Sequence, residues 1–106
     1  MAYPPRECPE CRAIFTPLDQ RQLFCSVEHR TAWSNRATVR GRVLTLYAMA
    51  ARQTRDGTRG DKATGKRAAQ IRNGLMQRYR DEDHEAGRMD AVSFAALRIR
   101  HGFDPI

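Results

Sequence analysis

Three cysteines and one histidine near the start of the chain have the spacing of metal ligands. Cys8 and Cys11 form a C-x2-C pair, Cys25 follows after thirteen residues, and His29 lies four positions further on. Side chains four positions apart share one face of a helix, so Cys25 and His29 can point toward the same ion. The full pattern, C-x2-C-x13-C-x3-H, is typical of a tetrahedral Zn²⁺ site made of thiolates and imidazole.

The donor types indicate which metal this site would take and what the metal would do. Soft thiolate sulfur favours zinc over magnesium, calcium or manganese. Four protein ligands leave no open coordination position, which predicts one structural Zn²⁺ and no catalytic metal. The alternative is that the three thiols and the histidine are unconnected buried side chains.

The charge of the chain is concentrated in its middle third. The 106 residues carry a net charge of +7 and an isoelectric point near 10.2. Residues 36–80 hold ten Arg and two Lys against two Asp, a net charge of +10, whereas residues 1–35 are neutral and residues 81–106 sum to −3. A basic segment of this kind predicts an anionic partner.

The basic residues are mostly arginine, and two explanations of this bias remain open. The planar guanidinium group suits phosphate recognition, which favours a nucleic-acid partner. A GC-rich genome also raises arginine content, and in that case the bias has no functional meaning.

The first half of the chain predicts a small hairpin followed by a long helix. The runs RAIF (12–15) and RQLF (21–24) each end in an aromatic residue and are expected to be the two paired strands. Ser26 is a suitable N-cap for the helix that follows. Gly41 marks either a bend in that helix or a tight packing contact.

The second half predicts two further helices after a glycine-rich loop. Residues 54–65 are expected to form a flexible basic loop, and apolar residues then recur at helical spacing from Ala68 to Tyr79. The last helix has a predicted N-cap at Asp90 and a predicted Schellman stop at Gly102–Phe103. We therefore expect a small, mostly helical α+β protein, with a zinc-finger module at residues 1–36. Residues 37–106 would form a helical extension packed on the finger helix.

One stretch resembles a known group of proteins. The segment CPECRAIFTP…RQLFCSVEHRTAWSNR, within residues 8–36, is similar to small bacterial and prophage-borne zinc-finger proteins with a CPxCxxxF…FCSxxC/H-R pattern, which belong with the treble-clef group. The resemblance implies that Cys8, Cys11, Cys25 and His29 are the ligands. It also implies a mini-core made of Phe15, Phe24 and Trp33. Because His29 lies one position later than a second C-x2-C knuckle would require, a ββα finger geometry stays open beside the treble clef.

Two further motifs could indicate enzymatic chemistry, and neither does so convincingly. GDKATGK (60–66) matches most of a phosphate-binding P-loop, but Arg67 stands where Ser or Thr must bind Mg²⁺. The acidic run DEDHE (81–85) is typical of a solvated helix end. With His29 used as a ligand, only His84 and His101 remain as catalytic histidines, and both lie far away in sequence. We expect neither an enzyme nor a small-molecule substrate.

The leading functional hypothesis is a zinc-stabilised nucleic-acid-binding protein with a regulatory or accessory role in bacteria or phage. It would contact mainly backbone phosphates, of DNA before RNA. The candidate contacts are Arg36, Arg40, Arg42, Arg55, Arg59, Lys62, Lys66 and Arg67. The alternative is a zinc-finger adaptor for protein–protein interactions. The apolar run at residues 43–51 is then a candidate partner surface, which could also serve a homodimer.

The sequence also predicts where the protein acts. Its first residues contain no apolar segment of a secretory signal, and the longest mostly apolar run, Val43 to Ala51, is too short to span a bilayer. We therefore expect a cytoplasmic protein with no membrane partner.

Overall fold

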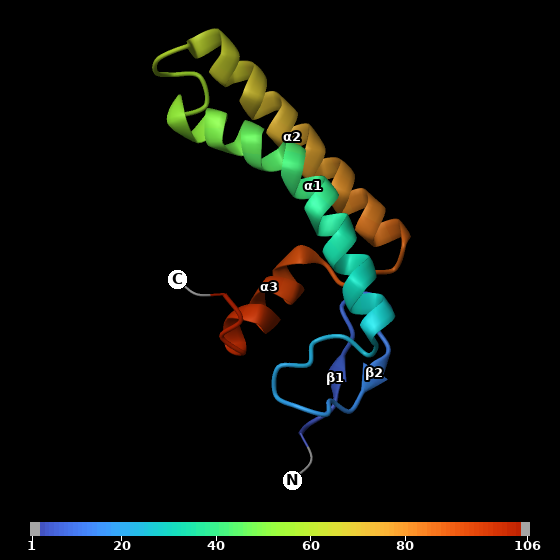
Figure 1. Cartoon of the computed structure of the whole chain (residues 1–106). Helices are drawn as coiled ribbons and strands as arrows, with labels where there is room; N and C mark the ends of the chain where they lie inside the picture. Colours follow the sequence, from blue (N-terminus) through green and yellow to red (C-terminus); the bar gives the residue numbers. More distant parts are fainter. Residues whose placement is uncertain (1–2, 105–106) are drawn as a thin grey trace. The chain divides into compact units, whose positions relative to one another are not determined.

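The structure is a computed structural model, and it describes residues 3–104. It is mostly helical, with a two-stranded antiparallel hairpin near the N-terminus (Figure 1). The elements in chain order are β1 (Arg6–Glu7), β2 (Ile14–Phe15), α1 (Val27–Gln53), α2 (Lys62–Glu85) and α3 (Ala91–Arg100). None of the helices in the described part of the chain combines the length and the apolar character needed to cross a membrane.

The chain divides into two compact units. One contains the residues up to Ser34 and those from Glu82 onward, and we call it the Cys/His unit. The other is Asn35–Asp81, which we call the hairpin unit. The helices α1 and α2 each contribute residues to both units. The expected zinc-finger module at residues 1–36 and helical extension at residues 37–106 stay a prediction.

The small hairpin is present, but its strands differ from those expected. Arg6 pairs with Phe15 and Glu7 with Ile14, so the C-x2-C pair lies in the turn between the strands. The expected pairing of residues 12–15 with 21–24 is wrong. Leu23 and Phe24 are consecutive and both buried, which is incompatible with a two-faced strand that buries alternate residues.

A side chain holds the segment that follows β2. The guanidinium of Arg6 donates hydrogen bonds to the backbone oxygens of Gln20 and Gln22, at 2.9 and 2.8 Å. These bonds connect the loop to β1 without a strand ladder. Held in this way, the loop places Leu23 and Phe24 in the core of the Cys/His unit.

The helix α1 begins where the sequence predicts. The Ser26 hydroxyl accepts a hydrogen bond from the backbone N–H of His29 at 3.2 Å, which confirms Ser26 as the N-cap. The helix then continues unbroken to Gln53. A Cβ at Gly41 would meet only Thr45 of the same helix, 4.0 Å away, so the tight packing contact proposed at this glycine is not observed among the described residues.

The core of the Cys/His unit combines one cysteine with aliphatic and aromatic side chains. Its buried members are Cys8, Leu23, Phe24 and Phe94. The ring of Phe94 lies edge-on to Phe24 and Trp33, with centroid distances of 5.8 and 5.2 Å. Such edge-to-face contacts are favourable arrangements for aromatic pairs. Phe15 and Trp33 pack against this cluster, and the sequence analysis missed the central place of Phe94.

Local capping signals define α3 at both ends. The Asp90 carboxylate accepts hydrogen bonds from the backbone N–H and the hydroxyl of Ser93, at 3.2 and 2.6 Å. At the other end Gly102 has φ 63°, and its N–H donates to the Ile99 oxygen while the N–H of Phe103 donates to the Arg98 oxygen. This is the Schellman arrangement that the sequence predicts.

The hairpin unit has a core of small residues. Ala51, Ala68 and Ala69 are buried, with Tyr47 and Ala50 packed against them. Figure 1 shows α1 and α2 running side by side in this unit, in opposite directions. Alanine at the contact lets two helix backbones approach closely, at the cost of a small buried area.

A tight turn closes the hairpin unit between α1 and α2. Because α2 begins at Lys62, this turn is shorter than the predicted loop at 54–65. The N–H groups of Gly57 and Arg59 both donate to the Thr54 backbone oxygen, at 3.1 and 2.9 Å. A Cβ at Gly65 would overlap the Thr54 side chain and lie 2.9 Å from Gly57 Cα. The second glycine of GDKATGK therefore serves close packing in this fold.

Candidate metal centre

Two elements bring the four candidate ligands together. Cys8 and Cys11 come from the β1–β2 turn, Cys25 immediately precedes the Ser26 cap, and His29 lies in the first turn of α1. Their ligand atoms all lie within 4.8 Å of one another. The four side chains could therefore bind one metal ion.

Two of the three donor-atom distances below agree with a tetrahedral site, and the distance from Cys25 Sγ to His29 Nδ1 is shorter. A zinc ion with Zn–S bonds of about 2.3 Å and a Zn–N bond of about 2.0 Å places two sulfurs about 3.8 Å apart, and a sulfur and nitrogen about 3.6 Å apart. Cys11 Sγ and Cys25 Sγ are 3.7 Å apart. His29 Nδ1 lies 3.8 Å from Cys8 Sγ and 3.1 Å from Cys25 Sγ. The imidazole thus presents Nδ1 to the centre.

The turn that carries the first two cysteines is closed by backbone hydrogen bonds. The N–H of Cys8 donates to the Ala13 oxygen at 2.9 Å, and the N–H of Arg12 donates to the Cys8 oxygen at 2.7 Å. Arg12 itself has φ 64°, the left-handed conformation that turns the chain back into β2. The guanidinium of Arg12 also forms an ion pair with Glu7 at 2.6 Å.

The electrostatics differ sharply between two of the thiols. Burial raises the pKa of Cys8, but hydrogen bonds from the backbone N–H groups of Cys25, Cys11 and Glu10, and from His29, outweigh it and lower the pKa to about 7. Cys25 has no comparable set of donors. Burial and the neighbouring sulfurs of Cys11 and Cys8 raise its pKa to about 11. Without a cation bound nearby, the Cys25 thiol therefore keeps its proton at neutral pH.

The candidate centre is continuous with the core of its unit. Cys8 is fully buried and belongs to the same cluster as Phe24 and Phe94. The backbone N–H of Met89 donates to the Pro9 oxygen at 3.0 Å, which ties the segment before α3 to the cysteine turn. Sequence reasoning missed this connection, because the two residues are far apart along the chain and carry no motif.

The acidic run at residues 81–85 forms no second centre. Within residues 3–104, the Cys8, Cys11, Cys25 and His29 group is the one set of three or more His, Cys, Asp or Glu side chains close enough to hold an ion. Asp83 instead accepts from the guanidinium of Arg88 at 2.8 Å. The two side chains of this pair are only 18 and 21 % exposed, so Asp83 is less solvated than the predicted helix end implies.

Comparisons with known proteins identify no relative of this chain. No family model, no curated protein and no solved structure matches this chain. The candidate centre is therefore interpreted from the spacing, distances and burial of its own residues.

The eight basic residues considered for nucleic-acid contact fall into two groups. Arg36 and Arg40 are half-buried. The guanidinium of Arg40 stacks on the ring of Tyr79, 4.7 Å from its centroid, and donates to the Tyr79 oxygen at 3.4 Å. Arg40 therefore helps to hold α1 against α2. The exposed ones are Arg42, Arg55, Arg59, Lys62, Lys66 and Arg67.

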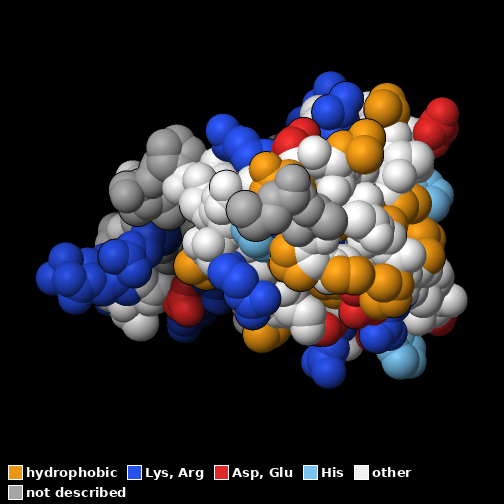
Figure 2. Space-filling view, turned by 90° about the horizontal axis from the view of Figure 1, so that it is seen from below, with side chains coloured by type: hydrophobic (Ala, Val, Ile, Leu, Met, Phe, Trp, Pro, Cys, Tyr) orange, Lys and Arg blue, Asp and Glu red, His pale blue; other side chains and the backbone are white. Residues whose placement is uncertain are grey.

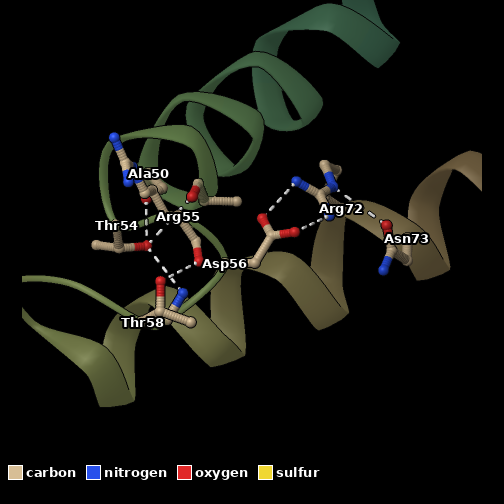
Figure 3. Close-up of polar contacts among 9 residues, drawn as sticks. Ala50, Thr54, Arg55, Asp56, Thr58, Arg72 and Asn73 are labelled. Carbon is tan, nitrogen blue, oxygen red and sulfur yellow. Dashed lines mark hydrogen bonds and ion pairs between the residues drawn. The ribbon is translucent and has the colours of Figure 1, made fainter.

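Two further arginines join the basic cluster at the closed end of the hairpin unit. A hollow there is lined by Ala51, Arg52, Arg55, Asp56 and Arg72. Arg72 forms an ion pair with Asp56, sixteen residues earlier, at 2.9 Å (Figure 3). Neither Arg52 nor Arg72 was among the expected contacts. Arg72 faces Asp56 of the turn, whereas the side chain of Arg55 points away from this pair (Figure 3).

The charge follows the two units closely. The hairpin unit contains ten Arg and two Lys against three Asp, a net charge of +9. The Cys/His unit contains seven Arg against nine acidic residues, a net charge of −2. Ligation of a dication by three thiolates would make the Cys/His unit one charge more negative.

One face of α1 in the hairpin unit leaves apolar side chains uncovered. Val39, Val43, Leu46 and Met49 are between 46 and 66 % exposed. Exposed apolar side chains also occur on the face drawn in Figure 2, where they are interspersed with Lys and Arg side chains. Single exposed apolar residues are ordinary, but four at helical spacing form a stripe that a partner could cover.

Proposed function

We propose that this protein is a zinc-stabilised nucleic-acid-binding protein in which the hairpin unit contacts the phosphates of duplex DNA. The separation of charge carries this proposal: +9 is concentrated in the hairpin unit and −2 remains in the Cys/His unit. A local excess of this size draws a polyanion to one part of the molecule. The metal centre would then have a structural role.

Zinc is the proposed metal because of the donor set and its spacing. Three sulfurs and one imidazole nitrogen form a soft, four-coordinate set. The 3.7 Å separation of Cys11 Sγ and Cys25 Sγ agrees with zinc–thiolate bond lengths. Bound zinc would add a direct link between the cysteine turn and the start of α1, and so stabilise residues 6–34.

A treble-clef-like arrangement is the proposed geometry of the centre. Its support is that one ligand pair lies on a turn between two short strands, while the other pair flanks a helix start. In a ββα finger the helix supplies both of its ligands from within its own turns, whereas Cys25 precedes α1 here. This geometry agrees with the similarity of residues 8–36 to small bacterial and prophage zinc-finger proteins.

The proposed mode of DNA contact is electrostatic, without base stacking. The hairpin unit contains two aromatic residues, Tyr47 and Tyr79. The first packs on the alanine core and the second carries the Arg40 guanidinium. With neither ring available as a stacking platform, contacts to backbone phosphates remain the main source of affinity.

Salt-dependent binding to a short duplex DNA tests this function. If about five phosphates are neutralised, the logarithm of the affinity should fall with the logarithm of salt concentration at a slope of about −4 to −5. Fluorescence anisotropy at several salt concentrations measures this slope. Absence of binding at the lowest salt concentration would exclude the proposal.

A protein-interaction adaptor is the second candidate function, favoured by the exposed stripe of Val39, Val43, Leu46 and Met49. A protein partner, or a second copy of the chain, would bury this stripe. Pulldown from nuclease-treated lysate distinguishes the two functions. A specific partner that survives nuclease treatment and is lost with Leu46→Asp favours the adaptor, and a partner that vanishes with the nuclease favours nucleic acid.

A further inference from the structure

We infer that a pocket of the Cys/His unit binds a peptide segment of a partner protein, through one large apolar side chain flanked by Asp or Glu. This inference goes beyond the proposed function, because it gives the negatively charged unit a partner of its own. The pocket has a volume of about 730 Å³. All of its lining residues belong to the Cys/His unit.

The pocket is lined mainly by apolar side chains, and some of them are uncovered. Leu23, Trp33 and Phe103 contribute to its lining. Leu18 and Val27 also line it and are 89 and 62 % exposed. Sites of roughly 300–1,000 Å³ enclose small organic ligands, so this pocket is large enough for an apolar side chain of a peptide. Covering the exposed side chains would remove apolar surface from water, which favours binding.

The loop before α1 contributes one side of the pocket and is held by hydrogen bonds. The N–H of Leu18 donates to Gln22 Oε1 and the N–H of Arg21 donates to Asp19 Oδ1, both at 2.7 Å. Gln22 Nε2 donates to the Phe24 oxygen at 3.0 Å. Because this side is already ordered, a ligand loses little affinity to the ordering of the loop.

The end of α3 and the residues after it also contribute to the pocket, and two guanidinium groups meet there at one ring. Arg98 donates two hydrogen bonds to the Asp104 carboxylate, at 2.9 and 2.7 Å. Its guanidinium carbon lies 5.3 Å from the Phe103 centroid and 5.5 Å from the Trp33 centroid. The guanidinium carbon of Arg21 lies 5.1 Å from the same Phe103 ring. Both distances are within the range of cation–π contacts.

The charged residues of the pocket favour an acidic partner. The lining contains three arginines, Arg21, Arg30 and Arg98, against a single acid, Asp19. Asp104 compensates the charge of Arg98. Arg21 and Arg30 are exposed and form no ion pair within residues 3–104. Carboxylates next to an apolar anchor would therefore meet guanidinium groups that have no counter-ion, although the unit as a whole is negatively charged.

The distribution of polar groups suits a peptide better than a free small molecule. Small-molecule sites orient their ligands with a few polar groups placed inside an otherwise apolar cavity. Within residues 3–104 no polar or charged residue is buried, so the polar groups of this pocket lie toward solvent. A peptide reaches such groups with neighbouring residues while one of its side chains enters the pocket.

The aromatic rings of the pocket are not arranged to stack a nucleobase. Trp33 packs against Phe24 and Phe94, with centroid distances of 5.9 and 5.2 Å, and Arg98 lies over its ring. Phe103 carries the two guanidinium groups described above. Base stacking requires an open ring face. The space in the pocket is therefore better matched by an apolar side chain than by a base.

Selection from a library of short random peptides displayed on phage, with the full-length protein as bait, tests the class of ligand. We expect the selected peptides to share one large apolar residue next to Asp or Glu. Synthetic peptides without tryptophan are then titrated against the fluorescence of Trp33, the single tryptophan of the chain, which lines the pocket. Failure to select any peptide, or selection of basic or uncharged peptides, overturns the proposal.

Val27 and Val92 provide a matched pair of variants. Both are exposed and lie in the first turn of a helix, in α1 and α3 respectively, but only Val27 lines the pocket. Aspartate is favourable in the first turn of a helix, so both Val→Asp variants should fold. We expect Val27→Asp to weaken peptide binding by about tenfold or more and Val92→Asp to leave it unchanged. Equal effects of the two variants overturn the site.

Arg21 allows a second test that does not alter the apolar lining. Arg21→Gln should weaken peptide binding by a few-fold and make it less sensitive to salt, because it removes an exposed charge pair. Arg100→Gln removes the same charge from an exposed position of the same unit that does not line the pocket, and should do neither. A loss shared by both Gln variants would assign the effect to net charge and overturn the site.

Competition separates the peptide from other occupants and from the proposed function. A single-stranded oligonucleotide that displaces the peptide would overturn the assignment in favour of nucleic acid. Peptide binding is measured independently of duplex binding, so a protein that binds peptide and no DNA leaves this inference standing and excludes the proposed function. A protein that binds DNA and selects no peptide gives the opposite result.

Discussion

The two units of this chain are stabilised in different ways. The Cys/His unit has strands of two residues each and a core of four buried side chains. A core of this size rarely sustains a fold alone, and the candidate metal centre lies against it. The hairpin unit consists of long helices joined by a hydrogen-bonded turn and packed through alanine. We propose that metal ligation supports the first unit, whereas helix formation with close packing supports the second.

The same comparison separates the proposed roles. The Cys/His unit holds the candidate metal ligands and has a slight negative charge, while the hairpin unit holds the positive charge. Changes in either unit should therefore affect one property much more than the other. The single tryptophan, Trp33, belongs to the Cys/His unit, so its fluorescence reports on that unit specifically.

Loss of a metal ligand should produce the largest difference between the two units. His29→Ala removes one of four donors from a site whose metal binding typically contributes on the order of 10 kcal/mol to folding. We expect loss of stoichiometric zinc and exposure of Trp33, with most of the helical signal retained. His84→Ala, at an exposed position of α2, is the matched control and should change neither. Zinc retention by His29→Ala would contradict the assignment.

Truncation of the aromatic core should come next in size. Phe94→Ala removes the ring that contacts both Phe24 and Trp33, and we expect a loss of about 3–5 kcal/mol in unfolding free energy of the Cys/His unit. Ile99→Ala, on the same helix at a side chain that is 78 % exposed, should cost less than about 0.5 kcal/mol. Denaturant unfolding followed by Trp33 fluorescence measures both. Equal costs would show that α3 is not part of this core.

Substitution of two glycines of α2 by alanine should change the stability of the hairpin unit in opposite directions. Gly65→Ala introduces a Cβ that overlaps the Thr54 side chain, and we expect a destabilisation of about 1–3 kcal/mol. Gly74→Ala meets nothing within 4 Å and should stabilise the helix by about 0.4–1 kcal/mol. Thermal unfolding followed by far-UV circular dichroism compares them. A stabilising Gly65→Ala would refute the close approach of α2 to the turn.

Acidic pH should change the stability of the two units differently, through a smaller effect at their helix caps. Hydrogen bonds from the side chain and then the backbone of Thr64 lower the pKa of Asp61, and those of Ser93 lower the pKa of Asp90. A lowered carboxyl pKa contributes stability that is present above the unfolded value and lost as the pH falls through the folded value. We therefore expect Asp61→Asn to flatten the acid dependence of hairpin-unit stability.

Asp90→Asn should hardly change the acid dependence of Cys/His-unit stability. Metal binding needs deprotonated ligands, so acid should release a bound metal, and we expect this release before the carboxyl groups of the caps are protonated. If the metal is the main support of the Cys/His unit, that support is lost before Asp90 is protonated. Urea unfolding at a series of acidic pH values compares the two variants, and equal flattening in both units would contradict the role of the metal.

Local features were predictable from the sequence, and long-range pairings were not. Each ligand pair, the Ser26 and Asp90 caps and the stop at Gly102 depend on residues within a few positions of each other, so short-range geometry was sufficient. The strand pairing was wrong because two-residue strands carry no alternation. Arg40 with Tyr79 and Arg72 with Asp56 are separated by 39 and 16 residues, and no local pattern marks such contacts.

The central claim is that a metal ion bound by Cys8, Cys11, Cys25 and His29 supports one unit and leaves the other independent. Amide NMR spectra of the full chain, recorded before and after addition of a strong zinc chelator, test it most directly. We predict that the signals of residues 3–34 and 82–104 collapse to unfolded positions, while most signals of residues 40–78 stay dispersed. Unchanged spectra in excess chelator would contradict the claim.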